Sequence, residues 1–318
     1  MLRLTALDQV PADLQASVVT IGNFDGVHRG HRALLTTLVQ RAQADHLTSV
    51  AVTFEPHPLA VLHPDRAPKA LTGLDDRLDL LEELGVDVAL VLPFTLELAA
   101  QTPREFVEEV FVDALHARVV MVGRDMRFGV RNSGDVHTLT ELGQEFGYDV
   151  AIVDDVGTDK RFSSTDTRAR MVEGDVAGAA EILGRTPEVH GVVVRGLQRG
   201  RELGYPTANL AADATGMVPE DGVYAGWLVR DRLPESDPDH RMPAAISVGT
   251  NPTFDDVHRR TVEAYVLDRD DLDLYGESVR VQFVQRVRGN TRFTTIEALI
   301  EQIGNDVDKI RDLLSDCD

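Results

Sequence analysis

Hydrophobic and polar positions in the first half of the chain alternate between two periods. Short runs of nearly continuous Val, Ile and Leu predict buried strands over 17–24, 48–55, 86–94, 117–123 and 148–156. Between them, apolar residues at helical spacing predict helices over 31–46, 75–85, 102–115 and 137–147. Strands buried on both faces that alternate with helices are typical of a parallel α/β sheet. Ligands of such sheets bind at the carboxyl ends of the strands.

The pattern changes in the second half. A helical segment over 163–185 breaks at Gly174 and links the two halves. Short strand-like segments separated by turns then follow over 189–196, 206–210, 222–229, 243–249, 261–268 and 277–287. This spacing predicts a small antiparallel barrel or sandwich. The acidic stretch 230–242 predicts a long hairpin loop. The segment 294–316 predicts a terminal amphipathic helix that packs against the barrel. We expect two domains, 1–186 and 187–318.

Composition limits the class of protein. A chain of 318 residues exceeds the usual size of one hydrophobic core, which agrees with two domains. The formal net charge of −21 argues against nucleic-acid and anionic-membrane partners. The apolar runs are too short to span a bilayer, the N-terminus lacks a signal-peptide pattern, and Cys317 is the only cysteine. We therefore expect a cytoplasmic monomer or weak homo-oligomer that acts on small molecules.

The first candidate site is GNFDGVHRGH, Gly22 to His31, at the end of the first predicted strand. Its glycines match neither a dinucleotide fingerprint nor a Walker A loop. Glycines still let the backbone approach a phosphate, and a following helix N-terminus supplies N–H groups and a positive dipole. His28 and His31 share one face if the helix starts within the loop. From the residues alone, a phosphate loop and a tight turn with two surface histidines remain equally open.

The second candidate site is RGLQRGRELGYPTANL, Arg195 to Leu210. Its alternating glycines and arginines suit a phosphate chain, and lysine occurs at only three positions in the whole chain. Thr207 and Asn209 lie two residues apart, so on a strand they face the same side. Their hydroxyl and amide oxygens are hard ligands suited to Mg²⁺. The alternative is a Gly/Arg turn followed by a polar edge strand.

Several motifs in order carry a resemblance to a known family. GNFDGVHRGH resembles the signature of the nucleotidylyltransferase superfamily, in the form found in bacterial bifunctional riboflavin kinase/FAD synthetases. TFEPHP (53–58), GRDMRFGVRNSGD (123–135) and RFSSTDTR (161–168) resemble its later motifs, with Met126 and Thr167 as departures. RGLQRGRELGYPTANL resembles the riboflavin kinase signature. The resemblance covers nearly the whole chain and implies a Rossmann-like nucleotidylyltransferase domain followed by a riboflavin kinase barrel.

For the first domain the resemblance implies FMN adenylyltransferase activity. The FMN phosphate would attack the α-phosphorus of ATP and release pyrophosphate, so catalysis would consist of positioning and charge stabilisation. The residues expected to be catalytic are His28 and His31. Those expected to contact ATP and its phosphates are Gly22, Phe24, Asp25, Gly26, Ser164, Thr165 and Arg168. Those expected near the flavin or nucleotide are His57, Asp125 and Phe128.

For the second domain the resemblance implies transfer of the γ-phosphoryl group from Mg·ATP to riboflavin. Glu263 would be the base that takes the proton of the riboflavin 5′-hydroxyl, with Val262 and Ala264 facing the other side of its strand. Thr207 and Asn209 would hold Mg²⁺. The residues expected to bind the ATP phosphates are Gly200, Arg201 and Gly204. No Walker A or protein-kinase motif occurs in the sequence, which excludes those two mechanisms.

The leading hypothesis is a bifunctional enzyme that converts riboflavin to FMN and FMN to FAD, with one ATP-dependent site in each domain. One alternative is an enzyme in which one half has lost or changed its activity. Another is a flavin-binding sensor without turnover, although a pure binder needs neither Glu263 nor the histidine pair. A nucleotidylyltransferase for pantetheine phosphate or glycerol phosphate would leave the second half unexplained.

Overall fold

The computed structural model describes residues 1–157, 161–196, 200, 203–250 and 260–315. The chain divides into two compact units. The first contains Met1–Lys69 and Leu74–Ser163, and the second contains Ala70–Gly73 and Ser164–Asp318. Among the described residues, no helix has both the length and the apolar character that a membrane span requires.

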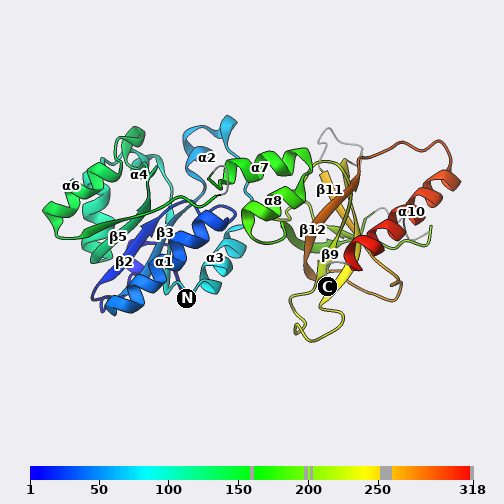
Figure 1. The fold of residues 1–318 in the computed structure, drawn as a ribbon, viewed down its shortest axis with the longest axis horizontal. Helices are drawn as coiled ribbons and strands as arrows, with labels where there is room; N and C mark the ends of the chain where they lie inside the picture. The colour runs from blue at the N-terminus through cyan, green and yellow to red at the C-terminus, as the bar shows by residue number, and fades with distance from the viewer. Residues whose placement is uncertain (158–160, 197–199, 201–202, 251–259, 316–318) are drawn as a thin grey trace. The chain divides into compact units, whose positions relative to one another are not determined.

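The first unit is built on a six-stranded parallel sheet in the order β1-β4-β3-β2-β5-β6 (Figure 1). Its strands are β1 (Leu2–Leu4), β2 (Ser17–Ile21), β3 (Thr48–Glu55), β4 (Val88–Pro93), β5 (Ala117–Gly123) and β6 (Asp149–Val153). The five strands expected from the sequence are confirmed. β1 was not expected because three residues carry too little periodicity, and it is added at the edge of the sheet by pairing with β4.

Helices cover both faces of this sheet. They are α1 (Arg29–Asp45), α2 (Pro58–Leu62), α3 (Leu74–Glu83), α4 (Leu96–Ala100), α5 (Pro103–Phe106) and α6 (Val136–Phe146). A π-helical stretch, Val107–Ala114, continues α5, and short 3-10 turns occupy Leu7–Gln9, Pro64–Arg66 and Val130–Asn132. Alternate strand residues pack in two separate cores. One core contains Leu35 and Leu81 from α1 and α3, and the other contains Phe111 and Leu139 from the opposite face.

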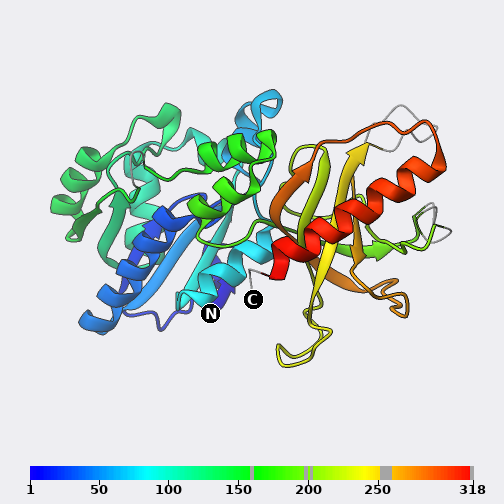
Figure 2. The same ribbon diagram turned by 45° about the vertical axis from the view of Figure 1, so that its right-hand side comes forward.

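The second unit is a closed antiparallel barrel in the order β10-β11-β8-β7-β12-β9. Its elements are α7 (Ser164–Glu173), α8 (Val176–Leu183), β7 (Glu188–Val194), β8 (Ala208–Leu210), β9 (Gly222–Val229), β10 (Arg241–Thr250), β11 (Arg260–Val266), β12 (Ser278–Arg288) and α10 (Ile296–Ser315). The helical break is confirmed at Gly174, where φ is +77°. Figure 2 shows α10 lying along the barrel, where Ile310 and Leu314 pack in one cluster with Trp227.

The barrel provides a stability test at Gly226. This residue lies within β9 between β10 and β12, and a Cβ atom there would overlap the carbonyl oxygen of Gln282. We expect Gly226→Ala to lower the free energy of unfolding of the barrel by about 3 kcal/mol or more, because the strands cannot separate locally. Urea unfolding followed by the fluorescence of Trp227, the only tryptophan, measures this change.

The matched control is Gly249→Ala in β10, whose added Cβ would meet, among the described residues, the side-chain amide of Asn290 at 3.1 Å. Its unfolding midpoint should stay near that of the wild type. An unchanged midpoint for Gly226→Ala would contradict the close packing of β9 on its neighbours.

Candidate functional sites

The loop between β2 and α1 has a strained backbone. Phe24, Gly26 and Val27 all have positive φ angles, of 48°, 79° and 36°. The left-handed region is costly for a β-branched residue such as Val27, so the surrounding structure must impose it. The burial of Phe24 and Val27, which are 1 % and 0 % exposed, supplies that constraint. Strain of this kind is typical of functional loops and favours the phosphate-loop interpretation over a simple turn.

The two histidines of this loop form a stacked pair. α1 begins at Arg29, so His28 is the N-cap residue, and its Nδ1 atom accepts a hydrogen bond of 3.3 Å from the backbone N–H of His31. The two imidazole rings stack with their centroids 3.7 Å apart. Because Nδ1 of His28 is the acceptor, the proton of the neutral ring is on Nε2. The shared face expected from the sequence is confirmed, with His28 at the helix cap rather than inside the helix.

The environment of His31 favours the neutral ring. Burial of the imidazole, followed by the nearby His28 and the positive charge of Arg161, holds the pKa of His31 well below the ordinary 6.5. Its Nδ1 atom is buried and has no hydrogen-bond partner in the described part of the chain. His31 therefore enters any reaction near neutral pH as an uncharged group.

A cavity of about 200 Å³ lies beside this pair, at the carboxyl ends of the strands. Besides the two histidines, its lining includes Gly22, Phe24, Gly30, Asp125, Met126, Arg161 and Phe162. Arg161 forms an ion pair of 2.6 Å with Asp125 and a longer one of 3.5 Å with Asp155. An anionic ligand in the cavity would compete with these carboxylates for the guanidinium group. Arg161 was given no role from the sequence, although it opens the quoted RFSSTDTR motif.

The other residues predicted for this unit do not line the cavity. Asp25 is buried, and Gly26 provides one of the positive φ angles of the loop. His57 is the N-cap of α2, where its Nδ1 accepts from the N–H of Leu59, and its Nε2 is 3.3 Å from the Asn23 amide.

Phe128 is buried in the core, where its ring packs edge-on against that of Phe106. Phe128 is therefore not among the residues that line the cavity, and its contact with a flavin or nucleotide stays a prediction. Ser164, Thr165 and Arg168 lie at the start and in the middle of α7, which belongs to the second unit. Their contacts with ATP stay a prediction.

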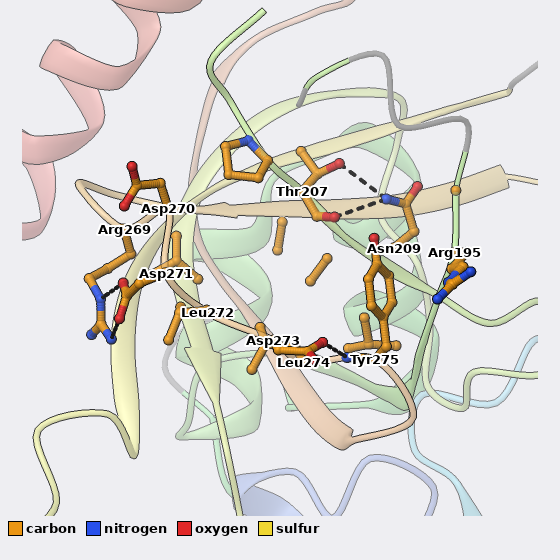
Figure 3. A pocket seen from close by; sticks show the side chains of 16 residues that line it. Arg195, Thr207, Asn209, Arg269, Asp270, Asp271, Leu272, Asp273, Leu274 and Tyr275 are labelled. Atoms are coloured by element: carbon orange, nitrogen blue, oxygen red, sulfur yellow. Dashed lines mark hydrogen bonds and ion pairs between the residues drawn. The ribbon is translucent and has the colours of Figure 1, made fainter. Parts of the chain in front are cut away.

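The second unit contains two neighbouring cavities that share Thr207. The first, of about 320 Å³, is lined by polar residues from the segment 206–209 and from the loop 269–275 (Figure 3). The second, of about 360 Å³, is mainly apolar and is lined by Tyr205, Tyr265, Phe293, Leu299, Ile303 and Val307, together with Glu263. The first presents Arg195, Thr207 and Asn209 together with three aspartates of the loop, and the second presents a mainly apolar surface that suits a flat ring system.

Thr207, Asn209 and Glu263 meet where these cavities adjoin. Glu263 pairs with Asn209 across β11 and β8, and the Thr207 hydroxyl donates to Glu263 Oε2 at 3.5 Å. The Asn209 amide donates to the Thr207 hydroxyl and carbonyl oxygens at 3.1 and 3.2 Å, as Figure 3 shows. Val262 and Ala264 are buried in the barrel core while Glu263 is half-buried, so the predicted alternation along this strand is confirmed.

The glycines before this motif allow close packing. At Gly200 a Cβ atom would overlap the carbonyl oxygen of Tyr205, and at Gly204 φ is +88°. Gly196 packs against the Asn209 amide so closely that a Cβ atom would overlap it. Arg201 lies outside the described residues.

Two further features were not assigned from the sequence. Arg195 stacks over the ring of Tyr275, 5.5 Å from its centroid, on the wall of the polar cavity (Figure 3). Arg288 and the buried Asp306 form an ion pair of 2.7 Å that lines the apolar cavity and ties α10 to β12. Tyr275 lies outside the motifs quoted for the two candidate sites, and a pairing between positions as distant as Arg288 and Asp306 leaves no local sequence pattern.

Comparisons with known protein families find two domains in the order that the motifs predict. A family model for FAD synthetase matches residues 10–166, and one for riboflavin kinase matches residues 183–314. The bifunctional riboflavin kinase/FMN adenylyltransferase of Escherichia coli K12 is 36 % identical over 303 residues, which cover 94 % of this chain and 93 % of the relative. The protein of the same description from Bacillus subtilis is 31 % identical, with 91 % and 90 % covered.

A solved structure is also similar over nearly the whole length. It comes from Streptococcus pneumoniae, is described as a macrolide-efflux protein, and matches with a TM-score of 0.84 at 30 % identity. The match covers 98 % of each chain.

The burial of His31 leads to a prediction for its titration. At pH 6.5, where an ordinary histidine is half protonated, the His31 ring should remain neutral because burial, the neighbouring His28 and the positive charge of Arg161 disfavour the charged form. The unfolded chain binds this proton more tightly than the folded chain, so His31 should make the first unit less stable as the pH falls through 6.5. An NMR titration of the imidazole nitrogens, assigned with His31→Asn, measures the pKa directly. A ring half protonated at pH 6.5 would contradict this environment.

Proposed function

Because the chain belongs to the family of bifunctional riboflavin kinase/FMN adenylyltransferases, and thus phosphorylates riboflavin to FMN and adenylylates FMN to FAD, we propose how its residues divide the two reactions. We assign adenylyl transfer to residues 1–186 and riboflavin phosphorylation to residues 187–318. ATP serves both sites, and riboflavin, FMN and FAD are the flavin substrates and products. The cytoplasmic location, the monomeric or weakly associated state and the absence of nucleic-acid partners stay predictions from the sequence.

In the adenylyl transfer, the α1 N-terminus and the stacked His28–His31 pair receive the triphosphate. The FMN phosphate attacks the α-phosphorus, and the bond to pyrophosphate breaks, so negative charge develops on the departing group. Nε2–H of His28 donates to this charge, because Nδ1 is already occupied by the His31 backbone. His31 acts as a neutral donor beside it. The stacked pair at a helix N-terminus beside the cavity is the observation that carries this proposal.

The remaining residues of the first site hold the ligand and shape the loop. Gly22 and Phe24 form the cavity wall under the phosphates, while Asp25 and Gly26 keep the turn that places them. Arg161 exchanges its partner Asp125 for a ligand phosphate when the cavity fills. The roles of Ser164, Thr165 and Arg168 at the β- and γ-phosphates rest on their motif.

In the kinase reaction, Glu263 accepts the proton of the riboflavin 5′-hydroxyl, whose oxygen then attacks the γ-phosphorus of ATP. The carboxylate lines the apolar cavity beside Thr207, which lines both cavities, so the flavin ring occupies the apolar one and ATP the polar one. Thr207 lines both and holds Glu263 by its hydroxyl group. The position of Glu263 at this junction is the observation that carries the proposal.

Thr207 and Asn209 fit a magnesium ion that is shared with ATP. Their oxygen atoms are hard donors, and the Asn209 amide is oriented by its two hydrogen bonds to Thr207. Within the described ranges, no group of three or more His, Cys, Asp or Glu residues could hold a metal by itself, so phosphate oxygens would complete the coordination. Bound Mg²⁺ would neutralise charge on the phosphates during transfer.

The other interpretations predict different products. A single-activity enzyme would stop at FMN or would require supplied FMN, and a sensor would leave riboflavin unchanged. Incubation of the protein with riboflavin, ATP and Mg²⁺, followed by chromatographic separation of riboflavin, FMN and FAD, distinguishes them. Glu263 and the histidine pair favour turnover over mere binding.

The histidine pair is tested by His28→Ala and His31→Ala. We expect each variant to lower kcat for FAD formation by about 10²–10³, the usual effect of removing one donor to a developing charge. FMN formation should be unchanged, because the kinase site lies in the other unit. His137→Ala is the matched control, since that side chain is 83 % exposed on α6. Wild-type adenylylation in both variants would disprove the assignment.

The catalytic base is tested by Glu263→Gln. Loss of the carboxylate should reduce FMN formation by about 10²–10⁴ while adenylylation of supplied FMN continues. Glu235→Gln, an exposed residue of the excursion between β9 and β10, is the matched control. Riboflavin phosphorylation at the wild-type rate by Glu263→Gln would remove Glu263 from the mechanism.

A further inference from the structure

A buried arginine reaches the phosphate loop from outside it. Arg77 lies on α3 and is 5 % exposed. Its Nη1 donates to the backbone carbonyl of Asn23 at 2.9 Å, and its Nη2 donates to Glu55 Oε2 at 2.8 Å and to the carbonyl of Phe54 at 3.4 Å. One guanidinium group thus joins α3, the end of β3 and the loop that follows β2.

Stability alone does not explain this arrangement. Burial of a cation carries a large desolvation cost, and a well-packed apolar residue often stabilises a core as well or better. The cost is only partly compensated here, because the Glu55 side chain is 48 % exposed and Arg77 Nε is buried with no hydrogen-bond partner among the described residues. The planar guanidinium group, with its fixed donors, is instead well suited to hold two acceptors in a set geometry.

The acceptor in the loop is Asn23, the residue that precedes the strained backbone. Its carbonyl oxygen also accepts a hydrogen bond of 3.2 Å from Thr53 Oγ1, and its side-chain amide is 3.3 Å from His57 Nε2. The next residue, Phe24, has a φ of 48°. Fixing the Asn23 carbonyl from two directions therefore fixes the peptide group that leads into Phe24.

Phe24 transmits this constraint to the histidines. Its ring meets His31 edge-on, with the centroids 5.4 Å apart, and it lies beneath Gly22 in the cavity wall. His31 in turn stacks on His28. A continuous series of contacts thus runs from the guanidinium group to the pair that faces the triphosphate.

We propose that Arg77 is a positioning residue for adenylyl transfer, which holds the Asn23 carbonyl and thereby sets the orientation of Phe24 and the His28–His31 pair. It does not touch the substrates. This inference rests on the proposed function of the histidine pair. It makes α3 part of the adenylylation machinery, although none of the motifs of the family resemblance includes this helix.

The first experiment compares Arg77→Met with Glu55→Gln in the full chain. Arg77→Met removes the donors to Asn23, and we expect kcat for FAD formation to fall by about 10–100-fold, as for the loss of a charged hydrogen bond. Glu55→Gln removes the ion pair but leaves the contact of Arg77 with Asn23, so adenylylation should stay within about twofold of the wild type. Riboflavin phosphorylation by the same molecules should be unchanged and serves as an internal control.

A second readout separates positioning from a merely structural role. We expect Arg77→Met to bind a non-hydrolysable ATP analogue with the wild-type number of sites per chain and with Kd values similar to those of the wild type. Its kcat should fall while KM for FMN changes little. Millimolar guanidinium ion should partly restore the rate of Arg77→Ala, because the ion can occupy the space that the side chain leaves.

Three results would overturn the inference: unchanged adenylylation in Arg77→Met, equal losses in Arg77→Met and Glu55→Gln, or a loss of ATP sites in proportion to activity. Should Arg77→Met fail to fold, Thr53→Val removes a neutral donor to the same carbonyl while keeping the side-chain shape. We expect it to lower kcat by about 2–10-fold, and an unchanged kcat would again overturn the inference. Full activity of the His28→Ala and His31→Ala variants would instead refute the proposed function itself.

Discussion

The first site depends on one constraint, the left-handed backbone that carries the chain from β2 into α1. Phe24 and Val27 adopt positive φ angles that neither residue favours, and their complete burial keeps them there. The turn brings His28 to the cap of α1, and the cap bond aligns its ring with that of His31. The position of the helix N-terminus, the stacking of the two histidines and the cavity wall all follow from this path of the backbone.

The second unit solves a different problem, because a flavin and a nucleotide have opposite surface chemistry. The barrel contains an apolar and a polar cavity that would separate the two ligands, and Thr207 lies in the wall of both. In the proposed reaction, transfer takes place at this shared wall, near the point where Glu263 and Asn209 face each other across two strands. The pairing of β8 with β11 brings these residues together although they are far apart in the sequence.

Hydrophobic periodicity predicted most of the fold, since each long strand and helix buries a regular stripe of side chains. It could not predict β1, because three residues carry no period, nor closure of the barrel, which depends on pairings between distant strands. At the sites, motifs identified residues that are neighbours in sequence, such as His28 and His31. The contact of Arg77 with Asn23 could not be predicted, because the two residues are 54 positions apart and a single arginine in a helical segment has the pattern of a surface residue.

The groups inside the first cavity, rather than the net charge of the chain, determine how the first site attracts an anionic ligand. The chain carries a formal net charge of −21, so the molecule as a whole repels ATP and FMN. Physiological salt screens that repulsion beyond about 8 Å, which leaves binding to groups inside the cavity. There the helix N-terminus and the neutral His31 offer donors, while Arg161 is already paired with Asp125. A ligand that gains the cation must displace this carboxylate, and a phosphate group can do so because two of its oxygens match the guanidinium geometry. In the proposed site, Asp125 would therefore compete with the ligand for Arg161, and this competition would favour ligands that carry phosphate at the correct distance from the histidine pair.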